Sequence, residues 1–167
     1  MNSILFRDDD INIYTDMGIF TRVHDLFDKH NKVHTIAVEM RDLWESKDIF
    51  YYIAMKRNIK VGLHGWTHKD YSKLSFEECN HDIEKSLNYW NGNRNRMITP
   101  EMAAHESNRI DTFYPPWNRV SDNLIRACER NGLKVDARYS LPEVYIFHFW
   151  AMIEGNRIKE LEELLKR

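Results

Sequence analysis

The sequence has few of the residues that mark several common protein classes. It contains two cysteines, Cys79 and Cys128, whose spacing shows no pairing, so we expect buried small side chains in a reducing compartment. No run of about 18 apolar residues is present, and the first residues lack the charged and then apolar pattern of a signal peptide. These absences predict a cytoplasmic protein without a membrane partner.

Excess charge and glycine are also scarce. With 24 basic and 26 acidic residues the net charge is −2, which excludes a strongly basic surface over the whole chain and argues against nucleic acid as a partner. No glycine-rich turn follows the first predicted strand, so dinucleotide-binding and phosphate-binding loops have no support. The chain is, however, 43% apolar, and 167 residues fit one domain spanning 1–167 with a real core.

Short apolar runs alternate with segments of helical period along the chain. Strands are expected at 3–6, 32–40, 59–63, 110–114, 133–137 and 144–149. Helices are expected at 17–30, 42–58, 75–92, 120–132 and 156–167. This order predicts parallel strands with helices outside them, and an open doubly wound sheet and a closed or incomplete (β/α) barrel both fit it.

Two local signals set the expected limits of the helix at 75–92. Ser75 and Glu78 form the pattern of a capping box at its start, and Gly92 suits its end. Residues 91–108 carry the weakest pattern, and we expect a loop and a short helix there.

Polar side chains follow four of the predicted strands at the points where these strands end. They are the run Asp8–Asp9–Asp10, the pair His64 and His68, the segment 113–119, and His148. In parallel α/β folds the active site assembles at the carboxyl edge of the sheet. The four groups therefore predict one site.

The aspartates and the histidine pair together suggest a metal ion. Three adjacent carboxylates repel one another, and a cation would relieve the repulsion; the alternative is a solvated loop with a helix-capping Asp. His64 and His68, four residues apart, can present two nitrogens to one tetrahedral ion, and two histidines with one carboxylate are a common zinc set. The alternative is one surface and one core histidine.

The other two groups also allow two interpretations each. His148 lies in an apolar run and is either a hydrogen-bonded core residue or a proton donor, for which its ordinary pKa of ~6.5 is suited. Pro115 and Pro116 either simply end a strand or place Trp117 as the wall of a groove, where a sugar or other flat ring would stack.

Taken together, "DDD" after the first strand, "HGWTH" after the third, a Pro-Pro-aromatic strand end and the late "IFHF" resemble the polysaccharide deacetylases. This is the NodB-homology group of carbohydrate esterase family 4. The resemblance runs over nearly the whole chain, and the HxxxH element with the upstream Asp pair is its specific part. It implies a distorted, incomplete (β/α) barrel with six or seven parallel strands.

The resemblance also implies a metal-dependent amidohydrolase that removes N-acetyl groups from a glycan containing amino sugars. Zinc is the expected ion, with cobalt, nickel and manganese as alternatives. The implied roles are general base for Asp9, metal ligands for Asp10, His64 and His68, general acid for His148, and oxyanion donor for the backbone N–H of Trp117. The register with Asp8 and Asp9 as the working pair stays open.

The chain departs from the family pattern at three places. Arg7–Asp8 replaces the usual Thr-Phe, Tyr114 replaces the arginine before Pro-Pro, and Asn118 replaces the glycine after the aromatic residue. Arg7 is expected to supply the missing charge beside the base, with Arg138 as a second candidate. The full set of supporting or substrate-binding candidates is Arg7, Asp8, Trp66, Tyr114, Pro116, Asn118 and Arg138.

These departures keep two other functions open. One is the hydrolysis of a non-sugar C–N bond, such as a ring amide. The other is a catalytically inactive, carbohydrate-binding relative of the family. The expected partner is thus a carbohydrate or another small acetylated substrate.

Overall fold

Strands and helices alternate along the chain, as the sequence predicts. A computed structural model describes residues 4–97, 109–139, 142–153 and 156–167. Its strands are β1 (Leu5–Ile11), β2 (His34–Val38), β3 (Ile59–Leu63), β4 (Thr112–Phe113), β5 (Lys134–Val135) and β6 (Val144–Phe147). Its α-helices are α1 (Met17–Lys29), α2 (Lys47–Met55), α3 (Phe76–Met97), α5 (Asp122–Arg130) and α6 (Arg157–Leu165). Short 3₁₀ helices are η1 (Leu43–Glu45), η2 (Tyr71–Lys73), η4 (Pro116–Asn118) and η5 (Phe149–Ile153).

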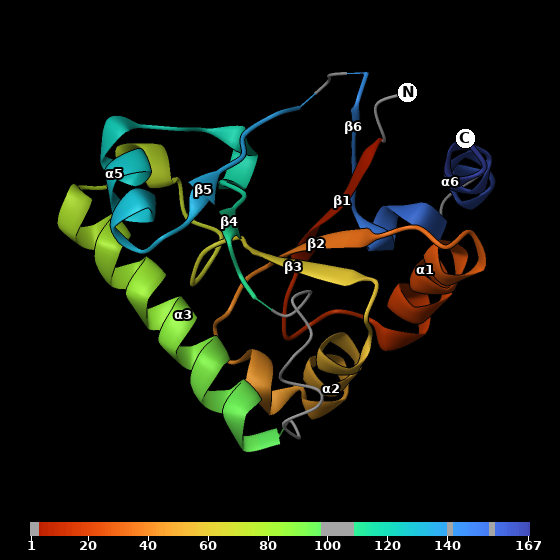
Figure 1. Cartoon of the computed structure of the whole chain (residues 1–167), viewed down its shortest axis with the longest axis horizontal. Helices are drawn as coiled ribbons and strands as arrows, with labels where there is room; N and C mark the ends of the chain where they lie inside the picture. Colours follow the sequence, from red (N-terminus) through yellow and green to blue (C-terminus); the bar gives the residue numbers. More distant parts are fainter. Residues whose placement is uncertain (1–3, 98–108, 140–141, 154–155) are drawn as a thin grey trace.

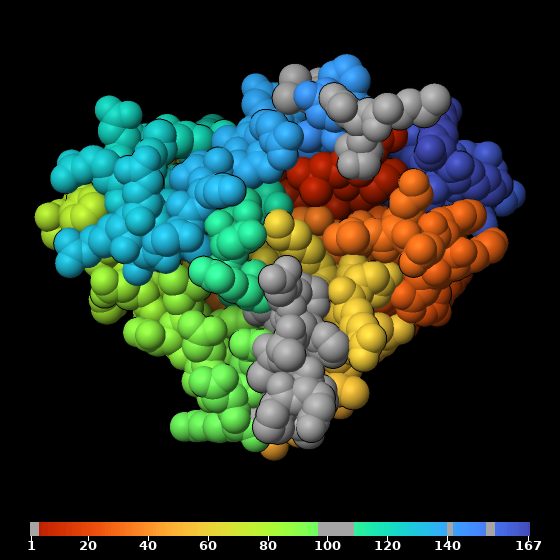
Figure 2. All heavy atoms as spheres, in the orientation of Figure 1, coloured from red at the N-terminus to blue at the C-terminus, as the bar shows by residue number. Residues whose placement is uncertain are grey.

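The six strands form one parallel sheet in the order β5-β4-β3-β2-β1-β6. Figure 1 shows the sheet curled into a half-barrel with the helices outside it. In the all-atom view, α6 at the end of the chain lies against α1 near its beginning (Figure 2). The prediction of an incomplete (β/α) barrel is confirmed.

The core lies between the central strands and the helices that cover them. All five residues of β2 are buried, as expected for a parallel strand covered on both faces. From the helices, Phe20 and Phe27 of α1 and Trp90 of α3 are fully buried against this core. Cys79 and Cys128 are free and buried, as predicted. Within the described ranges, no helix is both long and apolar enough to cross a bilayer.

The first strand is longer than predicted. The sequence suggested a strand over 3–6 stopped by the aspartates, but β1 continues through Asp8 and Asp9 to Ile11. Two partners make this possible: Arg7, two residues away on the same strand, pairs with Asp9, and the distant backbone N–H of Phe149 donates to Asp8. A carboxylate with such partners does not need water, so it can lie within a buried strand.

The long helix α3 begins as predicted but ends later. Ser75 and Glu78 form the expected capping box, in which the Ser75 N–H donates to Glu78 at 2.8 Å and the Glu78 N–H donates back at 3.2 Å. The predicted end at Gly92 is wrong, because α3 continues to Met97. A glycine inside a helix costs only about 1 kcal/mol, which a long helix tolerates. Of the loop and short helix expected over 91–108, the part at 98–108 lies outside the described residues.

Candidate active site

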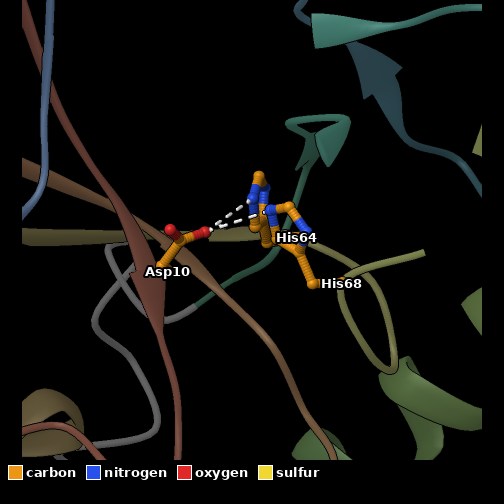
Figure 3. Close-up of side chains that lie close together, drawn as sticks. All are labelled: Asp10, His64 and His68. Carbon is orange, nitrogen blue, oxygen red and sulfur yellow. Dashed lines mark ion pairs between the residues drawn. The ribbon is translucent and has the colours of Figure 1, made fainter. Parts of the chain in front are cut away.

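Asp10, His64 and His68 converge at the carboxyl ends of β1 and β3 (Figure 3). The Nε2 atoms of His64 and His68 each lie 3.3 Å from Oδ1 of Asp10. The three ligand atoms all lie within 4.8 Å of one another. Two bonds of about 2.0–2.1 Å at a tetrahedral angle separate ligand atoms by roughly 3.3 Å, so this spacing fits a zinc-type ion. Oδ1 of Asp10 is also buried without a hydrogen-bond donor, and coordination to a cation would compensate for its burial.

The backbone at the end of β1 turns Asp10 toward the histidines. Asp10 has φ of 66°, in the left-handed region, which aspartate tolerates better than most residues. The pairing of β1 with β2 shifts register between Asp8 and Ile11, as at a β-bulge. A bulge interrupts the alternation of side chains along a strand and redirects one of them. The Asp10 side chain therefore does not follow the regular alternation of side chains that holds for Asp8 and Asp9.

His64 is held by a backbone carbonyl from the neighbouring strand. Its Nδ1 lies 2.6 Å from the carbonyl oxygen of Tyr114, and the side chain is almost fully buried. A carbonyl only accepts, so Nδ1 carries the proton and Nε2 is left with its lone pair facing Asp10. This is the tautomer that a metal ligand requires.

His68 is reached through a turn that needs glycine. Gly65 has φ of 102°, and an added Cβ would lie 2.3 Å from the hydroxyl of Tyr71. That hydroxyl accepts the N–H of Trp66 at 3.0 Å. The ring of His68 then stands edge-on to Trp117, with centroids 4.4 Å apart.

Asp9 is bound by a buried arginine. The guanidinium of Arg7 donates from Nε to Oδ1 at 2.7 Å and from a terminal nitrogen to Oδ2 at 2.8 Å. The same terminal nitrogen donates to Oδ1 of Asn118 at 2.8 Å, and the guanidinium lies 4.8 Å from the ring centroid of Tyr114. Arg7 therefore lies where a charge beside Asp9 was expected, whereas Arg138 pairs with Asp136 through bonds of 2.9 and 2.7 Å.

His148 completes the group around Asp10. Its Nε2 lies 3.2 Å from Oδ2 of Asp10, and the side chain is 37% exposed. The contact with Asp10 raises the pKa of His148, and a like contact raises the pKa of His68. Burial alone would raise the pKa of Asp10, but its contacts with His148, His64 and His68 outweigh burial and hold that pKa well below the usual range.

Three predicted site residues lie away from this group or at its margin. Asp8 is fully buried and contacts Phe149 and His34 instead, whereas Asp10 faces His64 and His68. The ring of Trp66 packs on α3, 5.4 Å from Tyr89. Pro116 is buried in η4.

Trp117 and its neighbour Asn118 both adopt the left-handed conformation, and the Trp117 side chain is exposed. Trp117 has φ of 53°, although this region favours glycine, and it is 54% exposed. The Asn118 N–H donates to the Pro115 carbonyl at 2.9 Å, which closes a tight turn around Pro116 and Trp117. The turn brings the indole next to His68.

Two functional contacts had no signal in the sequence. The carbonyl of Tyr114 orients His64, but a backbone group has no residue identity to detect. His34 lies fully buried 3.4 Å from Asp8, a contact that the residues around His34 in the sequence do not indicate. Both contacts depend on how the strands are ordered in the sheet.

Neither a family model nor a curated protein matches the chain, but several solved structures do. A family 4 pseudoenzyme from Bacillus anthracis aligns with a TM-score of 0.68 at 16% identity, over 98% of this chain and 62% of the other. A peptidoglycan N-acetylglucosamine deacetylase aligns with a TM-score of 0.72 at 15% sequence identity, over 99% of this chain and 82% of the other. A family 4 acetyl xylan esterase from Clostridium thermocellum, in complex with a cobalt ion, aligns with a TM-score of 0.63 at 14% sequence identity. The alignment covers 97% of this chain and 81% of the other.

At such low identities, these structural alignments show the fold alone. The chain is similar in structure to carbohydrate esterases of family 4, as the sequence motifs suggested, and it spans less than two thirds of the length of the pseudoenzyme.

Proposed function

We propose that this chain is a metal-dependent amidohydrolase that removes N-acetyl groups from a glycan containing amino sugars. The convergence of Asp10, His64 and His68 is the observation that supports the proposal most directly. The similar structures include a peptidoglycan N-acetylglucosamine deacetylase and an acetyl xylan esterase, both of which release acetyl groups from carbohydrates.

Asp10, His64 and His68 are the proposed ligands of a divalent ion, with zinc favoured by the donor set of one carboxylate and two imidazoles. One similar structure holds cobalt, so cobalt is a second candidate. When bound, such an ion lowers the pKa of a coordinated water to about 7 and polarises a carbonyl oxygen.

Asp9 is the proposed general base. Its two bonds from Arg7 hold the carboxylate in one orientation, next to Asp10 on the same strand. In this position it accepts the proton of the water that attacks the acetyl carbon.

His148 and Trp117 are proposed to act on two atoms of the substrate whose charge changes, the nitrogen of the departing amine and the oxygen of the oxyanion. The contact with Asp10 raises the pKa of His148, which favours the protonated ring and suits a donor to the departing amine. The backbone N–H of Trp117, turned by its left-handed conformation, is the proposed donor to the oxyanion; one such donor contributes about 3–4 kcal/mol.

A second candidate is a carbohydrate-binding protein without turnover. The similarity to a family 4 pseudoenzyme supports it. In this chain, however, Asp9 is paired with Arg7 and His148 lies beside Asp10, so the proposed base and acid are both present. The deacetylase is therefore the better-supported proposal.

Elemental analysis combined with an acetate-release assay tests the proposal. Purified protein should hold about one divalent ion per chain and release acetate from N-acetylglucosamine oligomers. His68→Ala should lose both, and His81→Ala, an exposed histidine on α3, should lose neither. Full turnover of His68→Ala in chelating buffer would contradict the proposal. A bound ion without acetate release would favour the binding protein, and turnover of cyclic ureides alone would point to another C–N bond.

A further inference from the structure

Asp8 is a fully buried carboxylate that the proposed chemistry does not use. It lies in β1 between Arg7 and Asp9, but contacts neither the metal-ligand group nor the Arg7 guanidinium. Instead its Oδ1 accepts the backbone N–H of Phe149 at 2.8 Å. A buried carboxylate is costly, so a partner this distant in sequence indicates a specific task.

The contact between Asp8 and the Phe149 N–H affects the preceding residue, His148. His148 lies at the joint between β6, which ends at Phe147, and η5, which begins at Phe149. Both polar ends of the peptide that links His148 to Phe149 are held. The His148 carbonyl accepts the N–H of Ala151 at 2.9 Å, and the Phe149 N–H donates to Asp8. Holding this peptide plane restrains rotation about ψ of His148, and together with the preceding strand β6 it limits the direction in which the His148 side chain leaves the backbone.

Two buried histidines lie on the side of Asp8 that faces away from Phe149. Nε2 of His34 lies 3.4 Å from Oδ2 of Asp8, and Nδ1 of His34 lies 3.2 Å from Nδ1 of His24. His34 stacks on Phe27 with centroids 4.2 Å apart, and both histidines are fully buried. The carboxylate of Asp8 is thus confined on the side away from Phe149.

We propose that Asp8 is a positioning residue for His148. By holding the peptide after His148, it directs the imidazole toward Asp10 and the leaving nitrogen of the substrate. It is neither a metal ligand nor a general base in this account. The proposal rests on the proposed function, since a positioned acid matters only for a reaction that needs one.

A comparison of leaving groups tests the proposal. An amine leaves only when it is protonated, whereas 4-nitrophenolate leaves from 4-nitrophenyl acetate without an acid. Asp8→Ala should lower kcat for N-acetylglucosamine oligomers by about 10- to 100-fold, while KM and the ester rate change by no more than about twofold. Asp8→Asn keeps an oxygen for the Phe149 N–H and should restore most of the amide rate.

Leu124→Ala provides the matched control. Leu124 is fully buried in α5, which packs on α3, so its truncation loosens the fold without touching β6. The ratio of amide to ester rates should stay at the wild-type value in this variant. Equal losses on both substrates in Asp8→Ala, with loss of the metal, would overturn the proposal and leave Asp8 a support of the strand end.

A measurement without substrate separates this proposal from the proposed function. In metal-free protein, Asp8→Ala should speed hydrogen exchange of the Phe149 amide by about tenfold or more and weaken the ring contact between His148 and Trp150. Asp8→Asn should keep both signals. If the wild type proved inactive on both substrates, the proposed function would fail, and these signals would still decide the positioning. An unchanged His148 ring contact in Asp8→Ala would overturn it.

Discussion

Arg7 and Asp9 lie two residues apart on β1 and meet through two parallel hydrogen bonds of 2.7 and 2.8 Å. Arg7 is fully buried and Asp9 is 6% exposed, so little water screens the pair. Two parallel bonds of this kind are stronger and more directional than single contacts. Arg7 thus supplies a charge beside Asp9 in a chain that has Tyr114 directly before Pro115 and Pro116.

Removing the arginine should harm both stability and turnover. Arg7→Met leaves the Asp9 carboxylate buried without a partner, which should cost about 3–5 kcal/mol of unfolding free energy. The loss of orientation should lower kcat/KM by about 10- to 100-fold. Urea unfolding and acetate release measure the two effects. The double variant Arg7→Met/Asp9→Asn should lose less stability than Arg7→Met alone, and an equal loss would argue against a coupled pair.

Two glycines should respond in opposite directions to alanine. A Cβ on Gly62 would lie 2.2 Å from a ring carbon of Tyr114, so Gly62→Ala should cost about 1–3 kcal/mol. It should also weaken metal binding, because the Tyr114 carbonyl orients His64. Gly92 lies inside α3 with nothing within 4 Å of an added Cβ, and Gly92→Ala should gain about 0.5–1 kcal/mol. Urea unfolding compares the pair, and equal effects would contradict the prediction.

The buried histidines should make the fold sensitive to acid. Burial lowers the pKa of His24 to about 4 and that of His34 well below its usual 6.5. Below pH 6.5 these two histidines bind protons in the unfolded chain but not in the folded one. The free energy of unfolding therefore falls as the pH drops toward 4. For His24 alone the loss is about 3 kcal/mol. In His24→Leu, the free energy of unfolding measured in urea should change less between pH 7 and 4.5 than in the wild type. A pH dependence as steep as that of the wild type would contradict the role given to His24.

Metal should stabilise the folded protein through the ligand group. A bound ion at 100 times its Kd adds about 2.7 kcal/mol to the unfolding free energy, so a chelator should lower Tm and zinc should restore it. His68→Ala should not respond. Because Asp10 raises the pKa of His68, protons compete there, and zinc affinity should fall as the pH drops through that pKa. Calorimetric titration at several pH values checks the direction.

The alternation of parallel strands and helices and the meeting of Asp10, His64 and His68 could be predicted from the sequence because both depend on a local rule. The pattern alone did not separate an incomplete barrel from an open sheet, and that choice came from the resemblance to the polysaccharide deacetylases. Each of these three residues follows an apolar strand, and parallel strands bring their carboxyl ends to one edge. The roles of these residues stay predictions until the variants above are measured.

Features that depend on distant partners could not be predicted. The length of β1 and the burial of Asp8 depend on the Phe149 N–H, 141 positions away. The ring of Trp66 lies against α3 because Lys85 and Tyr89 of that helix receive it, with Lys85 Nζ 4.0 Å from the ring centroid. Neither partner is visible in the local pattern around the residue concerned.

Among the residues that the structure describes, the half-barrel leaves two strands with an unpaired side, and these strands are short. β5 has two residues, one of them the exposed Lys134, and β6 has four. A brief edge that carries a lysine presents few free backbone groups to a neighbouring molecule. The sheet can therefore stay open in crowded solution without recruiting foreign strands, which protects the chain against edge-to-edge aggregation.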